Sequence, residues 1–222
     1  MPDIEALVVD DTRGVIFFAP SDTFTAGPEN IWSIPLDAPT GSPAPIVRVS
    51  ESVLNAALTP AGDPEVSDIA LHPDGDILRV NGFDQGLPGD QSLDHIGDIL
   101  KRSPDMSPSG GDGTATAWVE RATLLAPTDS LGTPVPFTAL FNPSITTAPN
   151  GRILVGSDGT DSQFLVWLSA DGLTNRLIGD NTIFRADPDI AAIFATATLD
   201  FETRGIAVDG DSDVYMVNQD GL

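Results

Sequence analysis

The chain alternates short apolar runs with turn-forming residues, and one such pattern occurs three times. Residues 69–78 read IALHPDGDIL, residues 145–154 read ITTAPNGRIL, and residues 206–215 read IAVDGDSDVY. In each copy, two apolar runs flank a segment of Pro, Asp, Asn or Gly, residues that favour the backbone angles of tight turns. A looser copy lies around Gly14. The pattern therefore predicts four β-hairpins, and their recurrence predicts a repeat architecture.

After three of these hairpins the sequence offers two further strands. They are expected at 30–36 and 44–49, at 96–100 and 115–119 around a loop over 103–113, and at 163–168 and 174–178. The fourth unit stops at Leu222, directly after its hairpin. We predict an all-β, β-propeller-like fold with about four visible four-stranded blades, the last one incomplete. The blades fall at about 1–58, 64–125, 139–182 and 200–222 of a single domain, 1–222.

An incomplete last blade leaves the edge of a strand exposed, and proteins normally cover such edges. Two explanations stay open at this point. The sequence is a piece of a longer polypeptide, or a neighbouring copy supplies the outer strands by β-augmentation. The second explanation predicts a homo-oligomer that assembles head to tail, because a contact of this kind that does not close produces a filament.

The charge balance narrows the possible partners. Asp and Glu number 33 against 10 Lys and Arg, which gives a formal net charge of −23. Nucleic acid is not expected as a partner, because binding its phosphates requires clustered Lys and Arg. No apolar run is long enough to span a membrane, and residues 1–5 lack the basic start of a signal peptide. An acidic surface suits either a calcium-rich exterior or high salt. Abundant Thr, Gly, Asp and Pro with a single lysine lead us to expect an extracellular or cell-surface location.

Helical patterns are rare, and the tryptophans fall on predicted strands. Short helices are expected at 189–197 and at 52–58, where apolar residues recur at helical spacing. Trp32, Trp118 and Trp167 are expected to fill the space between neighbouring blades rather than to form a ligand platform.

One loop carries acidic residues at alternate positions and is a candidate calcium site. Asp209, Asp211 and Asp213 lie around Gly210, and Asp220 occupies the twelfth position, where calcium loops usually carry Glu. The alternative is a hairpin turn in which Asp side chains accept hydrogen bonds from their own backbone amides. Asp158 and Asp161 form a second oxygen-rich loop with the same two interpretations.

Three phrases resemble known propeller repeats. Residues 70–78 and 205–215 are similar to the blade openings of NHL-type and gluconolactonase/regucalcin-like propellers, and residues 31–37 are similar to their third strand. The resemblance implies a propeller scaffold, and such a scaffold hosts enzymes and binding proteins alike.

The lactonase-like members of this group hold a divalent metal with Glu, Asn and Asp side chains from inner strands. The positions of this sequence that such a resemblance offers as ligands are Glu5, Glu65, Asn142 and Glu202. The longer Asn-Asp signature around the metal site of those enzymes is absent. The alternative function is therefore a metal-dependent propeller hydrolase of lactonase type.

Other catalytic constellations lack parts. The chain has two histidines, His72 and His95, no cysteine and no Gly-x-Ser-x-Gly segment. A serine or cysteine triad and a zinc site are therefore not expected. The expected function is a non-enzymatic, exported structural or binding module with calcium-stiffened loops, whose partners are other copies of the chain or surface components.

Overall fold

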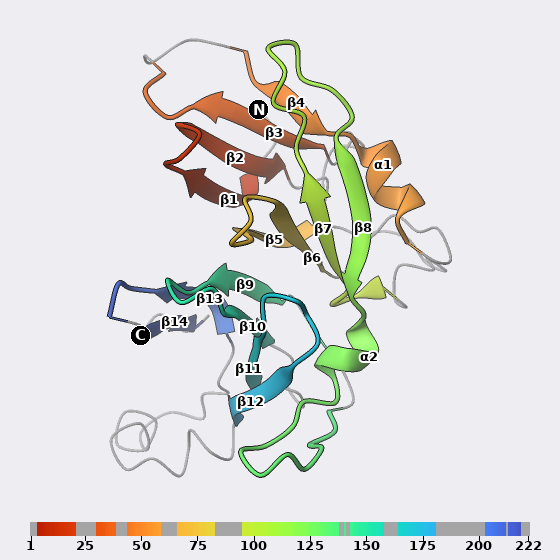
Figure 1. The fold of residues 1–222 in the computed structure, drawn as a ribbon, viewed down its shortest axis with the longest axis vertical. Coiled ribbons are helices and arrows are strands. Elements are labelled where there is room, and N and C mark those ends of the chain that lie inside the picture. Colours follow the sequence, from red (N-terminus) through yellow and green to blue (C-terminus); the bar gives the residue numbers. More distant parts are fainter. Residues whose placement is uncertain are drawn as a thin grey trace. The chain divides into compact units, whose positions relative to one another are not determined.

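The computed structural model contains mostly strands and two short helices in the part of the chain that it describes (Figure 1). The described residues are 4–20, 30–38, 44–58, 66–82, 95–137, 140, 143–157, 164–180, 203–211 and 213–218. They form two compact units, Met1–Glu120 and Arg121–Leu222.

The first unit contains two four-stranded antiparallel meanders. The first sheet runs β1 (Ile4–Asp10), β2 (Val15–Pro20), β3 (Ile31–Pro35) and β4 (Ile46–Val49), in that order. The second runs β5 (Val66–Leu71), β6 (Ile77–Asn81), β7 (Ile99–Ser103) and β8 (Thr114–Val119). β1 lies beside β5, and helix α1 (Glu51–Ala56) contacts β8. Sheets whose first strands meet in this way are arranged as neighbouring blades of a propeller.

An apolar layer fills the space between these two sheets. Phe17, Ile31 and Val49 from the first sheet are completely buried, together with Ile77 from the second. The alternation of buried and exposed positions along the strands places these side chains on one face. Burial of each such side chain contributes about 1.5–3 kcal/mol to the stability of the fold.

The second unit repeats this plan. Its four-stranded sheet runs β9 (Ser144–Thr147), β10 (Ile153–Ser157), β11 (Phe164–Leu168) and β12 (Asn175–Asp180), after helix α2 (Arg121–Leu124). A hairpin of β13 (Thr203–Val208) and β14 (Val214–Asn218) follows, and β13 lies beside β9 and β10. Leu154 and Leu165 are buried, and Ile206 and Met216 of the hairpin pack against them.

The three repeated phrases form hairpins with five-residue turns. In each turn the amide of the first residue donates to the carbonyl oxygen of the fifth, over 2.8, 2.8 and 3.1 Å at His72, Ala148 and Asp209. Gly75 and Gly151 have φ angles of 90° and 81°, which an L side chain rarely adopts. The turns therefore require glycine at these two positions, because the backbone there adopts a positive φ angle.

β-bulges recur at equivalent places and could not be foreseen from the pattern. The pairing of the first strand with the second shifts at Glu5, Ser67 and Arg204. The outer strands of the three complete sheets shift as well, and their extra residues are Arg48, Trp118 and Ile178. Such bulges bend the strand and increase its twist, as blades require.

Long loops cover the outer edges of two sheets. Residues 104–113 lie along β4, where the amide of Gly111 donates to the Val47 carbonyl oxygen over 3.2 Å and the amide of Asp105 donates to the Arg48 carbonyl oxygen over 2.9 Å. In the second unit, Thr128 pairs with Arg176 on β12 as an added parallel bridge. Both loops protect edges that would otherwise be free to pair with another chain.

The all-β, propeller-like fold is thus confirmed, while some element boundaries were wrong. β7 begins at Ile99 rather than at residue 96, because Gly97 has a φ of 88° and ends the preceding turn. Helix α1 falls near the predicted 52–58, and α2 was not predicted. The helix expected at 189–197 lies outside the described residues. Among the helices that the structure describes, none has the length and apolar character to cross a bilayer.

Candidate functional site

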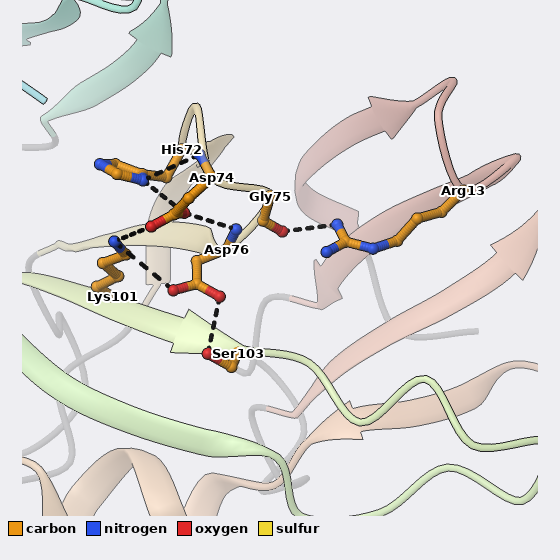
Figure 2. A network of polar contacts seen from close by, with 7 residues as sticks. All are labelled: Arg13, His72, Asp74, Gly75, Asp76, Lys101 and Ser103. Atoms are coloured by element: carbon orange, nitrogen blue, oxygen red, sulfur yellow. Dashed lines mark hydrogen bonds and ion pairs between the residues drawn. The ribbon is translucent and has the colours of Figure 1, made fainter.

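A network of polar contacts lies at the β5–β6 turn (Figure 2). The Asp74 carboxylate contacts His72 Nδ1 over 2.6 Å and accepts a hydrogen bond from the amide of Asp76 over 3.1 Å. The ammonium group of Lys101 on β7 forms ion pairs with Asp74 and, over 3.7 Å, with Asp76. The hydroxyl of Ser103 donates to Asp76 over 2.7 Å. We call these five residues the turn network.

Local structure explains the composition of the turn network. Asp74 is the third residue of a five-residue turn, where a short carboxylate reaches the amide two residues further along the chain. Lys101 and Ser103 are separated by one residue on β7, so both side chains leave the same face of the strand. The only lysine of the chain is thereby placed against two carboxylates of the neighbouring turn.

The ionisation of Asp74 is shifted by these contacts. Partial burial raises the pKa of this carboxyl group, but the hydrogen bonds from Lys101, the Asp76 amide and His72 outweigh burial and lower the pKa to about 2. Asp74 is therefore a stable anion at neutral pH, and it suits a structural role better than proton transfer.

Arg13 joins the β5–β6 turn to the turn of the first hairpin. The guanidinium of Arg13 donates over 2.6 Å to Asp10 and over 2.6 Å to the carbonyl oxygen of Gly75. A Cβ atom at Gly75 would approach the Arg13 guanidinium to 2.8 Å, so the glycine also makes room for this contact. The turns of two neighbouring sheets are thus fixed to one another.

His72 lies below the surface beside an aromatic ring. Its residue exposure is 7%, and its ring meets Trp118 edge to face at 5.6 Å. A buried imidazole whose Nδ1 contacts Asp74 holds the turn in place. Trp118, predicted to pack in the core, is half-buried.

The Asp209 loop has the geometry of a self-bonded turn. Oδ1 of Asp209 accepts the amides of Asp211 over 2.9 Å and of Asp213 over 3.0 Å. The Tyr215 hydroxyl donates to Oδ2 over 3.0 Å, and this hydrogen bond raises the pKa of the phenol. The side chains of Asp211 and Asp213 are exposed. In the described ranges, no three acidic or imidazole side chains converge as a metal-ligand group.

Several predicted ligands fall elsewhere. Glu5 is exposed and lies at the bulge of β1. The remaining positions of both predicted ligand sets lie outside the described residues: Glu65, Asn142, Glu202, Asp158, Asp161 and Asp220. The lactonase-type and calcium hypotheses therefore stay predictions.

The buried cations of the first unit were not predicted from the sequence. Arg48 donates to the Ser33 hydroxyl over 2.7 Å and to the carbonyl oxygens of Asp105 and Ser107 over 2.8 and 2.7 Å. Arg79 and Arg102 are 2% and 0% exposed. Arg48 is a lone charge inside an apolar run that was interpreted only as a strand, whereas Arg79 and Arg102 come just after the apolar residues of their predicted strands.

A second imidazole and carboxylate pair lies in the turn before β7. His95 is 4% exposed, and its Nδ1 lies 2.7 Å from Asp98 Oδ2. The Asp98 carbonyl oxygen accepts the amide of Asn81, which anchors this turn to the end of β6 over 3.0 Å. This pair, like the one at His72, orients the backbone of a turn.

Comparisons with known proteins support the fold alone. No family model matches the chain, and no curated protein sequence matches it. Among solved structures, the chain is similar to a chain of the crystal structure of the nidogen/laminin complex, with a TM-score of 0.55 and 17% identity. The alignment covers 97% of this chain and 56% of that chain, so the chain spans little more than half of its structural relative. These findings show a β-propeller-like, all-β fold without showing a subtype.

Proposed function

We propose that this chain is a non-enzymatic binding module whose propeller-like scaffold presents rigid turns to protein partners. The observation that carries the proposal is the internal bonding of the hairpin turns. Side chains of Asp74, Asn150, Asp171 and Asp209 each accept amides of their own turn. Turns fixed in this way lose little conformational entropy when a partner binds, which favours affinity.

The kind of partner is suggested by the fold and the charge. The similar solved chain comes from a nidogen/laminin complex, an assembly of proteins, which supports a protein-binding role. We infer that the partners are other copies of this chain or surface components, in an extracellular or cell-surface setting. The abundance of Thr, Gly, Asp and Pro with a single lysine supports this location, and the formal net charge of −23 keeps the protein soluble by self-repulsion.

Calcium is proposed as a stiffening ligand of the loops. The exposed carboxylates of Asp211 and Asp213 project from a turn whose backbone Asp209 already fixes. Carboxylate oxygens are the ligands that calcium prefers, and the side chains of Asp211 and Asp213 are not used in the Asp209 contacts. Asp220 is the further ligand proposed for this loop. Asp158 and Asp161 are the second proposed pair of ligands.

Calorimetric titration of metal-stripped protein with calcium tests this proposal against the lactonase alternative. One variant carries Asp211→Ala and Asp213→Ala, and a matched variant carries Glu65→Ala and Asn142→Ala. We expect calcium binding to weaken in the first variant only, with no lactone turnover in any of the proteins. Turnover that disappears with the second variant would overturn the non-enzymatic assignment, and circular dichroism of both variants controls for folding.

A further inference from the structure

Each sheet presents two faces with different neighbours. In the first unit, the β5–β8 sheet packs Ile69 and Ile77 against Phe17 and Ile31 of the sheet that precedes it in the chain. In the second unit, Ile206 and Met216 of the β13–β14 hairpin pack in the same way against the preceding β9–β12 sheet. We call the face of a sheet that packs against the sheet before it in the chain the preceding-side face. The opposite face is the following-side face.

The strand registers identify the equivalent face of the first sheet. One row across the second sheet is formed by paired residues of its preceding-side face: Ile69, Arg79, Leu100 and Ala117. On the fourth strand this row ends at Ala117, directly before the extra residue of the bulge, Trp118. The row at the same place in the first sheet consists of Leu7, Phe18, Trp32 and Val47. The preceding-side face of the first sheet is therefore the one that carries Leu7.

This face is apolar and partly exposed. Its members on the four strands are Leu7, Val9, Ile16, Phe18, Trp32, Ile34 and Val47. None of the seven is buried, and Leu7 and Val9 are 57% and 41% exposed. By contrast, Phe17, Ala19 and Ile31 on the other face of the same sheet have exposures of 0%, 1% and 0%. An exposed apolar sheet face of this kind marks an interaction surface.

The same face is free of charge. None of its seven side chains is ionisable, although the chain carries a formal net charge of −23. Binding at this face removes apolar side chains from water and buries no carboxylate of the face itself, in a chain whose many carboxylates otherwise repel a second copy.

A complementary face lies on the β13–β14 hairpin. Its preceding-side face is already packed, while Ala207 and Tyr215 pair with one another on the opposite, following-side face. Both are exposed, Tyr215 to 56%. In the one pair of sheets that packs together in each unit, a preceding-side face meets a following-side face. The hairpin thus has an exposed following-side face, which is the type of surface that packs against a preceding-side face such as that of the first sheet.

We propose that a second copy of this chain binds to the apolar preceding-side face of the β1–β4 sheet through the following-side face of its β13–β14 hairpin. The proposal rests on the binding function above and names its partner. The contact joins different surfaces of the two copies, so each bound copy presents a free surface of each type, and the assembly continues head to tail.

Sedimentation equilibrium over a range of protein concentrations tests the proposal. The wild-type mass is expected to rise above the monomer mass of 23.2 kDa as the concentration increases. Association is expected to strengthen from about 0.1 to 1 M NaCl, because screening removes the repulsion between acidic copies while apolar contacts persist. Leu7→Asp and Tyr215→Asp are each expected to weaken association at least about tenfold. Leu173→Asp, which alters a turn residue that is 85% exposed, is the matched control and should associate like the wild type.

A mixture of the two variants decides the mode of contact. The Leu7→Asp protein keeps an intact hairpin surface, and the Tyr215→Asp protein keeps an intact apolar face, so the mixture should form a heterodimer that grows no further. A wild-type protein that stays monomeric, or association that survives Tyr215→Asp, would overturn the proposal. Neither result would contradict the proposed non-enzymatic binding function. Lactone turnover would contradict that function instead.

Discussion

At the scale of single residues, the acidic side chains of the turns serve the backbone. Asp129 accepts the amides of Leu131 and Thr133, both over 2.8 Å, and Asp209 accepts two amides in the same way. Asp is suited to this position because its short side chain reaches the amide two residues ahead, whereas Glu does not. Part of the acidity therefore has a structural cause, whatever its effect on partners.

Asp74 makes the stability of the first unit pH-dependent. Its folded-state pKa of about 2 lies below the unfolded value of 3.8, so its contribution is complete above pH 3.8 and disappears as the pH falls toward 2. Asp74→Asn should lower the free energy of unfolding at pH 7 by about 1 kcal/mol or less, because the group is half-exposed. Urea unfolding should show the difference from wild type vanishing between pH 4 and pH 2. An exposed-site control, Asp37→Asn, should show a smaller effect.

Tyr215 is the only tyrosine, so its ionisation can be followed by phenolate absorbance. The hydrogen bond to Asp209 stabilises the neutral phenol and raises its pKa above 10. Asp209→Ala should therefore shift the titration to lower pH, while Asp211→Ala should leave it nearly unchanged. An unaltered titration in the Asp209 variant would contradict the contact described here.

At the scale of elements, the sequence predicted what is local and missed what depends on the neighbouring sheet. The hairpins at Gly75 and Gly151 follow from turn chemistry within ten residues, and the structure confirms them. The loop 104–113 was expected only as a connection, because its contacts with β4 bring together residues more than fifty positions apart. The start of β7 was predicted too early, at residue 96. Ile96 is apolar like the strand residues Ile99 and Leu100, but it lies in the turn before the strand.

The fit of loop 104–113 against β4 depends on a glycine. Gly110 has a φ of 70°, and a Cβ atom there would lie 2.2 Å from the Val47 carbonyl oxygen. Gly14 has a φ of 64° with nothing within 4 Å, so it carries the same backbone strain without the clash. Gly14→Ala should cost about 1 kcal/mol, and Gly110→Ala about 2–4 kcal/mol. Chemical denaturation measures the loss of unfolding free energy in each variant. Equal losses in the two variants would show that loop 104–113 does not contact β4 closely at Gly110.

Arg48 holds the same loop from the other side. Its side chain is buried and donates to two loop carbonyl oxygens and to Ser33. Arg48→Met retains much of the volume but removes the donors, and should destabilise the first unit by about 2–3 kcal/mol. Hydrogen exchange should increase at Asp105 and Gly111, whose amides bond to β4, and remain unchanged in the second unit.

At the scale of the whole molecule, periodicity predicted the propeller-like fold, whereas the candidate sites needed coordinates. Repeated turns at Gly14, Gly75 and Gly151 were sufficient to predict neighbouring antiparallel sheets. No periodicity shows which sheet face lacks a neighbour, because Leu7 and Ile69 occupy equivalent positions and differ only in what covers them. The same limit applies to buried Arg79, which the strand pattern treats as an interruption.

Charge repulsion and self-association should both appear in thermal unfolding, and they can be separated. With a formal net charge of −23, screening should raise the melting temperature of every variant as NaCl increases from about 0.1 to 1 M. Association stabilises only the folded state, so it should make the wild-type melting temperature rise with protein concentration. The Leu7→Asp protein should keep the salt dependence and lose the concentration dependence. If both proteins respond alike to concentration, the apolar face of the β1–β4 sheet is not where the copies meet.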